Sequence, residues 1–220
     1  MTVLFPKWTN RLPAMLALGA AFAGVSVVLL VWYLFSPNNT DVGYQPYQPI
    51  PYSHKLHAGL KGMDCRYCHR NVEHEAYASV PDADTCMGCH AQIAKESIQL
   101  QPLRDAYGDG AGDNPPIEWI KVHMLPDYAY FNHAVHLNKG VGCKSCHGRI
   151  DQMEIVRQVE PLSMGWCLEC HRDPVEHLRP EGVKPTDMTW EPTEQSIAAA
   201  RALFESGEVN PPVHCSACHR

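Results

Sequence analysis

A single pattern, C-x-x-C-H, constrains this chain more than any other feature of its sequence. It occurs five times and uses all ten cysteines of the 220-residue chain. In chain order, the first motif contains Cys65, Cys68 and His69; the second Cys86, Cys89 and His90; the third Cys143, Cys146 and His147; the fourth Cys167, Cys170 and His171; and the fifth Cys215, Cys218 and His219. Any fold must therefore present the same arrangement of two thiols and one imidazole at five places.

This spacing is the attachment signature of c-type haem. Two thiols add to the two vinyl groups on one edge of a porphyrin, and the adjacent histidine then lies where its imidazole can bind the iron. A zinc ribbon would take four cysteines from two pairs, so five pairs cannot be divided evenly, and zinc gives no reason for a histidine after each pair. Neither a thioredoxin-like motif nor a disulfide framework requires that histidine. We therefore expect five covalently attached haems.

The composition suits a fold built around such groups. The formal net charge is -6, so there is no basic surplus to indicate a nucleic-acid partner. Outside one N-terminal apolar run, the chain is rich in Pro, Gly, His and Cys and poor in Leu, Ile and Phe, so side chains alone would form a small core. No strong strand pattern is present. We predict a mainly α fold with extensive loop, a multihaem cytochrome c domain whose haems form the core, and one N-terminal transmembrane helix.

That helix is predicted from residues 14–35, an uncharged run of 22 residues. About 20 apolar residues cross the hydrocarbon layer of a membrane as a helix. Lys7 and Arg11 precede the run, so the positive-inside rule places the N-terminus in the cytoplasm. A cleaved signal peptide is the alternative, but the best small-residue cleavage site, residues 21–23, falls in the middle of the run. We predict that residues 1–35 form a cytoplasmic N-terminus and one uncleaved anchor, and that the rest is extracytoplasmic, where haem attachment takes place.

The exported part divides into a linker and a duplicated domain. Residues 36–51 are rich in Pro, Asn and Gln, and we predict an extended linker without regular helix. The stretches that begin at Tyr52 and Phe131 then repeat one order of features: an aromatic residue, H-x-x-H, Lys-Gly, a C-x-x-C-H motif and a hydrophobic-acidic pair. We predict one pentahaem domain at 52–220, with two-haem modules at about 52–100 and 131–178 and a terminal haem at 215–219.

Local signals predict several elements within this domain. Residues 101–118 should be loop, because they contain three glycines, Gly108, Gly110 and Gly112, and the pair Pro115-Pro116. A short helix is predicted at 91–100. The strongest helix is predicted at 194–206, with Thr193 as its cap and Gly207 at its end. Its apolar face would contain Ile197, Ala200, Leu203 and Phe204.

Each haem iron also needs a second axial ligand, unless that position stays open for a substrate. Eight histidines lie outside the motifs: His54, His57, His74, His123, His133, His136, His177 and His214. The two H-x-x-H pairs, His54 with His57 and His133 with His136, are the strongest candidates, because residues at i and i+3 lie on one side of a helical turn. One histidine of a pair can bind the haem next to it while its mate binds a neighbouring haem. We expect these four to be iron ligands.

Four histidines leave one iron unmatched. Met164, just before the fourth motif, is the candidate, although a methionine more often packs than ligates. Histidine–methionine ligation would give that haem a higher potential than its bis-histidine neighbours. His74 and His123 each occur in only one copy of the repeat, so we predict that neither is a ligand. For His177 and His214 the sequence favours neither role.

Beyond the motifs, four stretches resemble the pentahaem subunit of alternative complex III: CRYCHRNVEHEA, WIKVHMLPDYAYFNHAVHLNKGVGCKSCHG, LSMGWCLECHRDPVEHLRP and the terminal CSACHR. That complex is a quinol:electron-acceptor oxidoreductase of bacterial membranes, and the resemblance runs through nearly the whole chain from Tyr52. It implies a subunit on the periplasmic side of the cytoplasmic membrane. The implied partners are an iron–sulfur protein similar to molybdopterin oxidoreductases, polytopic quinol-binding subunits and a monohaem cytochrome c. His54, His57, His133, His136 and Met164 fall on matching positions, whereas those of His74 and His123 are not reliably histidine in that family.

Three functions are compatible with these features. The first is an electron-transfer subunit with no catalytic residues of its own, which carries electrons from quinol oxidised by its partners to a cytochrome c or another periplasmic acceptor. The alternative is a small membrane-anchored multihaem quinol dehydrogenase that feeds a periplasmic reductase, a class that normally carries four haems. The third is a multihaem reductase, for example of nitrogen oxyanions, which would need one haem with an open axial position.

Overall fold

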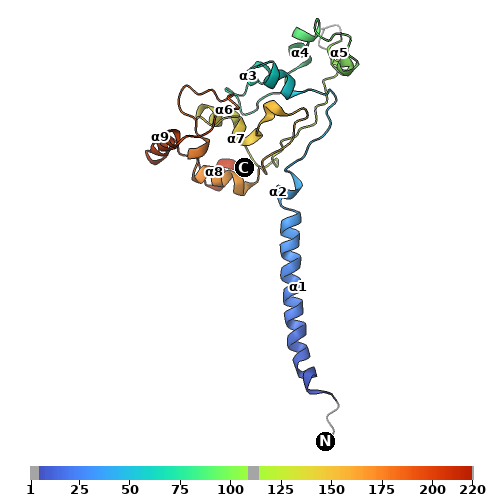
Figure 1. Cartoon of the computed structure of the whole chain (residues 1–220), viewed down its shortest axis with the longest axis vertical. Coiled ribbons are helices and arrows are strands. Elements are labelled where there is room, and N and C mark those ends of the chain that lie inside the picture. The colour runs from blue at the N-terminus through green and yellow to red at the C-terminus, as the bar shows by residue number, and fades with distance from the viewer. Residues whose placement is uncertain (1–4, 109–113, 220) are drawn as a thin grey trace. The chain divides into compact units, whose positions relative to one another are not determined.

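The structure is a computed structural model that describes residues 5–108 and 114–219. It divides into two compact units, Met1–Asp41 and Val42–Arg220. In the first unit, a short 3-10 turn, η1 (Lys7–Arg11), leads into α1 (Leu12–Leu34), which Figure 1 shows as one long helix. Lys7–Leu34 is long and apolar enough to cross a membrane, and a signal sequence would meet the same criterion. The side chains of α1 are exposed throughout.

The predicted linker differs from the structure in two respects. Residues 37–40 form one helical turn, α2 (Pro37–Thr40), because Pro37 stands at its first position, where a missing N–H costs no hydrogen bond. The later linker residues belong to the second unit. Gly43 N–H donates to the carbonyl of Gln158 at 2.8 Å, and Gln158 N–H donates back to Tyr44 at 3.0 Å. Ile50 is buried. Residues 42–51 therefore pack along the domain and do not form a free tether.

The second unit is built from short helices joined by loops. Their bounds are η2 (Lys55–Leu60, a π-helical turn), α3 (Cys65–Cys68), α4 (Ala83–His90), η3 (Ile98–Leu100), α5 (Gln101–Tyr107), α6 (His133–Asn138), α7 (Lys144–His147), η4 (Ile150–Gln152), α8 (Met164–Arg172), η5 (Val175–His177), α9 (Glu194–Glu205) and α10 (Cys215–Cys218). Residues 5–108 and 114–219 contain no strand, only the isolated bridges Ala129–His219 and Val141–Leu178. The predicted mainly α and loop fold is confirmed.

Capped helices hold three of the five motifs. The side chain of Asp64 accepts a hydrogen bond from Arg66 N–H at 3.0 Å and begins α3. The side chain of Asp82 accepts a hydrogen bond from Thr85 N–H at 2.9 Å and begins α4. The hydroxyl of Ser163 accepts one from Trp166 N–H at 3.3 Å and begins α8. Such caps satisfy N–H groups that a short helix leaves unpaired. The local sequence thus fixes where the helices that carry the first, second and fourth motifs begin.

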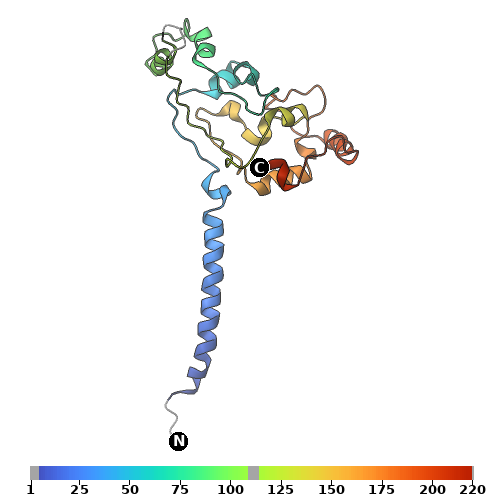
Figure 2. The same ribbon diagram turned by 180° about the vertical axis from the view of Figure 1, so that it is seen from behind.

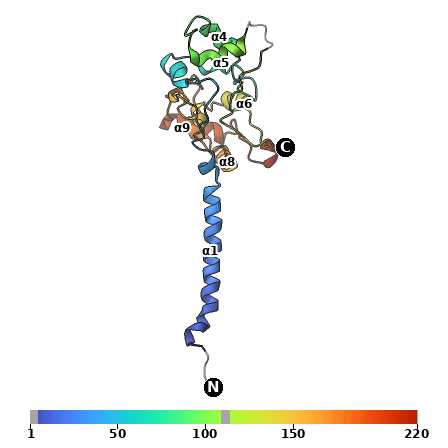
Figure 3. The ribbon, with the colours of Figure 1, turned by 90° about the vertical axis from the view of Figure 1, so that its right-hand side faces the viewer.

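Two predicted elements after the second motif were wrong. No regular helix spans 91–100, because α4 ends at His90 and only η3 follows, whereas α5 occupies the start of the predicted loop. Ala94 has a φ of 52°, a conformation that breaks a helix. Arg104 of α5 donates to the carbonyls of Lys95 and Ser97 at 2.7 and 2.9 Å, and Leu103 is 1% exposed. Figure 3 shows α4 and α5 side by side. Gly110 and Gly112 lie outside the described residues.

The predicted C-terminal helix is confirmed as α9, with Thr193 as its cap and Gly207 in a left-handed conformation after its end. Its Ala200 joins the small apolar cluster of Val175, Leu178 and Val209, against which Ile197 and Phe204 pack. In the described part of the chain, Leu103 is the only large side chain that is fully buried. Side chains therefore fill little of the interior, as the composition predicted.

Candidate functional site

The two H-x-x-H segments have the same local geometry. Tyr52 stacks on His57, with ring centres 4.5 Å apart, and meets His54 edge-on at 4.8 Å. In the second copy, Phe131 stacks on His136 at 4.3 Å and meets His133 edge-on at 4.8 Å. The aromatic residue thus fixes both imidazole planes through one stacked and one perpendicular contact.

Backbone carbonyls orient most of the candidate imidazoles. The Nδ1 atoms of seven histidines lie within hydrogen-bonding distance of a carbonyl oxygen: His57 with Ser53 at 2.9 Å, His69 with Ser79 at 2.6 Å, His90 with Ile93 at 3.0 Å, His133 with Ala76 at 2.8 Å, His136 with Asn132 at 2.8 Å, His171 with Pro212 at 2.7 Å and His219 with Tyr128 at 3.2 Å. A carbonyl can only accept, so each Nδ1 carries the proton and each Nε2 keeps its lone pair for a metal. All seven are predicted iron ligands.

Two pairs of these imidazoles have the spacing that a shared iron requires. Two metal–imidazole bonds of about 2 Å, each to a nitrogen about 1 Å from its ring centre, separate the ring centres by about 6 Å. The ring centres of His57 and His90 are 6.2 Å apart, and those of His136 and His171 are 6.0 Å apart. In each pair, the histidine from an H-x-x-H segment thus faces the histidine of the second motif of its own module.

The first members of the H-x-x-H segments lie near the first motif of each module. Burial, together with the nearby His69, lowers the pKa of His54 to about 4. Burial, together with His123 and His133, lowers the pKa of His147 to about 3. These imidazoles are therefore neutral at pH 7, which is the form that binds a metal.

His123 has a different relation to His147. Their ring centres are 4.4 Å apart and nearly perpendicular, which is too close for an iron between them. The Nε2 of His123 and the Nδ1 of His147 are buried without a hydrogen-bond partner, as is the Nδ1 of His54. The ring of His123 therefore packs beside the third motif.

The remaining candidates lie on the surface or at helix ends. His74 is exposed, His177 lies in η5, and His214 is the residue before α10. Met164 is the first residue of α8 and is 66% exposed. Met164 precedes Cys167 of the fourth motif by three residues, about one helical turn. Figure 2 shows α10 (red, beside the C-terminus) next to α8 (orange).

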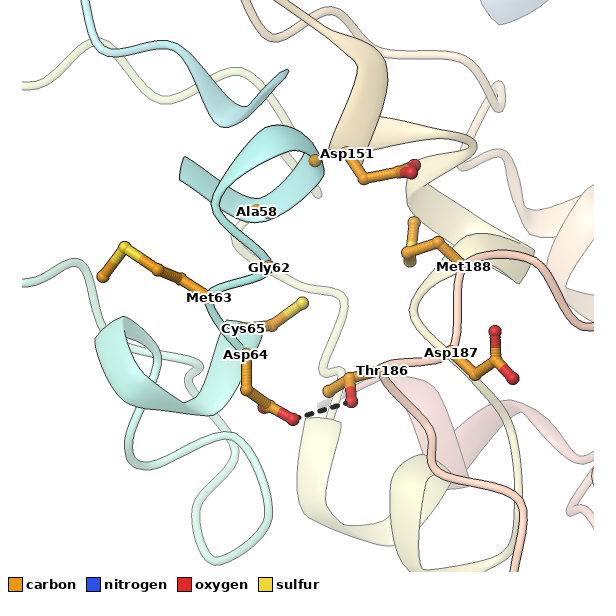
Figure 4. A pocket seen from close by; sticks show the side chains of 10 residues that line it. Ala58, Gly62, Met63, Asp64, Cys65, Asp151, Thr186, Asp187 and Met188 are labelled. Atoms are coloured by element: carbon orange, nitrogen blue, oxygen red, sulfur yellow. Dashed lines mark hydrogen bonds between the residues drawn. The ribbon is translucent and has the colours of Figure 1, made fainter. Parts of the chain in front are cut away.

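None of the ten cysteines forms a disulfide. Among the described residues, no three His, Cys, Asp or Glu side chains gather as a metal site, whereas a zinc ribbon would need four cysteines together. The thiol of Cys65 projects toward a pocket that residues from both modules line, among them Gly62, Asp151 and Met188 (Figure 4). Separate thiol pairs with a histidine beside each fit five haems.

Sequence analysis did not identify the carbonyls that orient the imidazoles. Ser79 follows His69 by ten residues, and Pro212 lies 41 residues from His171. Every residue carries a carbonyl, so no residue type marks such an acceptor. Only the fold brings these groups together.

Comparison with known proteins agrees with this site. Residues 129–220, which contain the third, fourth and fifth motifs, match the family model described as cytochrome c7 and related cytochrome c. The protein named menaquinone reductase, multihaem cytochrome c subunit, of Nitratidesulfovibrio vulgaris is 31% identical over 133 residues. That alignment covers 59% of this chain and 59% of the relative, so the chain spans less than two thirds of the relative's length.

The described chain is thus mainly helix and loop with a long apolar helix near its N-terminus, and its residues 129–220 are similar to multihaem cytochromes c. Its five C-x-x-C-H motifs are consistent with five c-type haems.

The haem count can be tested directly. The intact mass of the purified chain should exceed that of the 24.6 kDa polypeptide by five haems. Replacing Cys215 and Cys218 by Ala should leave four, because each motif attaches its haem independently. The double variant Cys215→Ser, Cys218→Ser is a matched replicate. Four haems in the unmodified chain, or no loss in either variant, would contradict the assignment.

Proposed function

We propose that this chain is a membrane-anchored electron-transfer subunit of a quinone oxidoreductase complex. Five attachment motifs in one chain carry this proposal, because they supply a series of redox centres. The apolar helix supports attachment to the membrane where quinones reside, and the menaquinone reductase subunit supports the link to a quinone. When bound, haem c supplies one-electron chemistry between ferric and ferrous iron without making or breaking bonds.

The chain's own residues would hold and orient the irons. In the proposal, each motif histidine is one axial ligand, and the H-x-x-H segments supply four of the second ligands. His57 binds opposite His90, and His136 opposite His171, as the ring spacings of 6.2 and 6.0 Å support. His54 and His133 then bind opposite His69 and His147, the motif histidines nearest to them.

This assignment leaves the haem of the fifth motif without a second histidine. We propose Met164 as its ligand, because α8 and α10 lie next to each other. A thioether ligand favours ferrous iron more than imidazole does, so this haem would have the highest potential of the five. This haem would then be the first of the five to be reduced.

The distal role of His57 predicts a spectroscopic change. His57→Ala should leave one ferric haem without its second strong ligand and convert it from low spin to high spin. His74→Ala is the matched control, because His74 is exposed and lies in the same module. Electron paramagnetic resonance of the oxidised variants checks both. A high-spin signal in both variants, or in neither, would rule out the proposed role of His57.

The role of Met164 predicts a change in potential. Met164→His should lower the midpoint potential of one haem by on the order of 0.1 V, a part of the roughly 0.8 V that axial ligands control. The matched control is Met124→His, since Met124 is also exposed, at 62%, and lies outside every motif. A redox titration of the haem absorbance measures both. If the Met164→His titration superimposes on that of the unmodified protein, Met164 is not a ligand.

The complex to which the chain belongs has two candidates. The relative from N. vulgaris favours a quinone reductase, in which the haems would pass electrons toward menaquinone. The resemblance of residues 52–220 to the pentahaem subunit of alternative complex III favours the opposite direction, from quinol to a periplasmic acceptor. For either complex, we propose that the quinone site lies in a polytopic membrane subunit that is a partner of this chain. A membrane-anchored quinol dehydrogenase would instead hold that site in this chain.

Purification from native membranes in mild detergent tests the proposal. We expect the chain to co-purify with at least one polytopic subunit, and a menaquinol analogue should reduce the haems of the complex but not those of the isolated chain. An iron–sulfur subunit and a monohaem cytochrome c in the same preparation would identify alternative complex III. Reduction of the isolated chain by the analogue would identify a quinol dehydrogenase. A preparation that contains no quinone-reactive protein would overturn the proposal.

A further inference from the structure

The order of the five motifs in space differs from their order in the sequence. The second motif lies next to the first in space. His57, which precedes the first motif, has its ring 6.2 Å from that of His90 in the second. Arg70, directly after the first motif, donates a hydrogen bond to Thr85 in α4. Burial raises the pKa of Cys86, and the nearby Cys68 raises it further.

The first motif is joined to the third, 78 residues later, counted from Cys65 to Cys143. Two consecutive residues connect them: the carbonyl of Pro185 accepts from Cys143 N–H at 3.1 Å, and the hydroxyl of Thr186 donates to Asp64 at 3.0 Å, as Figure 4 shows for Thr186.

A second set of contacts supports this junction. His133, which belongs to the second module, donates from its backbone N–H to the carbonyl of Ala76 at 3.1 Å and places its Nδ1 2.8 Å from the same oxygen. Ala134 N–H donates to Glu75 at 3.2 Å. The segment after the first motif therefore positions the H-x-x-H pair of the second module. The second motif makes none of these contacts.

The third motif is joined to the fourth, and the fourth to the fifth. His136, before the third motif, has its ring 6.0 Å from that of His171. His171 in turn places its Nδ1 2.7 Å from the carbonyl of Pro212, just before the fifth motif. Burial raises the pKa of Cys167, and the thiol of Cys218 adds to that shift.

We propose that the five haems follow the spatial order second, first, third, fourth, fifth. In Figure 1, α4, α3, α7 and α8 follow one another in this order across the second unit, with α10 next to α8. The haems of the second and fifth motifs are then the two ends of the series, and the first and third are neighbours at its centre. This order rests on the proposed electron-transfer function and adds to it the two places where electrons enter and leave.

Nuclear magnetic resonance of the fully reduced, haem-loaded chain tests the order, since reduced low-spin haems are diamagnetic and protons of adjacent haems give cross-peaks. His57→Met marks the haem of the second motif through a shifted methyl signal of an iron-bound methionine that the unmodified protein, with its single proposed ligand Met164, does not show. We expect that haem to contact one other haem. His136→Met, the matched variant in the second module, marks the haem of the fourth motif, which should contact two.

A sequential order would give two contacts for both marked haems and would overturn the proposal. If a marked variant loses its haem, the double variant Cys86→Ser, Cys89→Ser replaces it. Removal of a terminal haem leaves three of the four contacts between neighbours, whereas removal of the second haem of a sequential series would leave two. The measurement uses the isolated chain without quinone or partner subunits, so its outcome is independent of the test of the complex.

Discussion

The hydrogen bond from an imidazole Nδ1 to a backbone carbonyl is the interaction on which the site depends. It fixes the tautomer and the plane of the ring, and it leaves Nε2 as the only atom that can bind iron. Seven of the predicted ligands have this bond, and four of the acceptors lie ten or more residues away, on Ser79, Ala76, Pro212 and Tyr128. These bonds restrain loops that bury few apolar groups. The loops contain acceptor carbonyls such as those of Ser79 and Pro212, and the short helices contain most of the motif residues.

The duplicated modules use this interaction in a shared arrangement. In each copy, an aromatic ring orients an H-x-x-H pair whose second histidine faces the second motif of its module. The copies differ where they meet. His133 is bound by the carbonyl of Ala76 from the first module, whereas the Nδ1 of His54 is buried without a partner. The second module is therefore assembled against the first, and the hydrogen bonds of Pro185 and Thr186 connect Cys143 to Asp64.

Much of the site could be predicted from local pattern, because C-x-x-C-H and H-x-x-H have fixed spacings. The cap and face of α9 were predicted for the same reason. The helix α5 was missed because its stability comes from burial of Leu103 and from bonds of Arg104 to distant carbonyls, neither of which is visible in a Gly- and Pro-rich stretch. The contact of the first motif with the third could not be predicted, since it is made by Pro185 and Thr186, which carry no motif.

The central claim is that the chain itself supplies two strong axial ligands to each of its five irons, and so transfers electrons without binding a substrate at iron. Electron paramagnetic resonance of the fully oxidised, unmodified protein measures this most directly. The account predicts low-spin ferric signals from all five haems, and no carbon monoxide binding after reduction. A high-spin ferric signal from one haem, together with carbon monoxide binding at one iron per chain, would show an open position and contradict it.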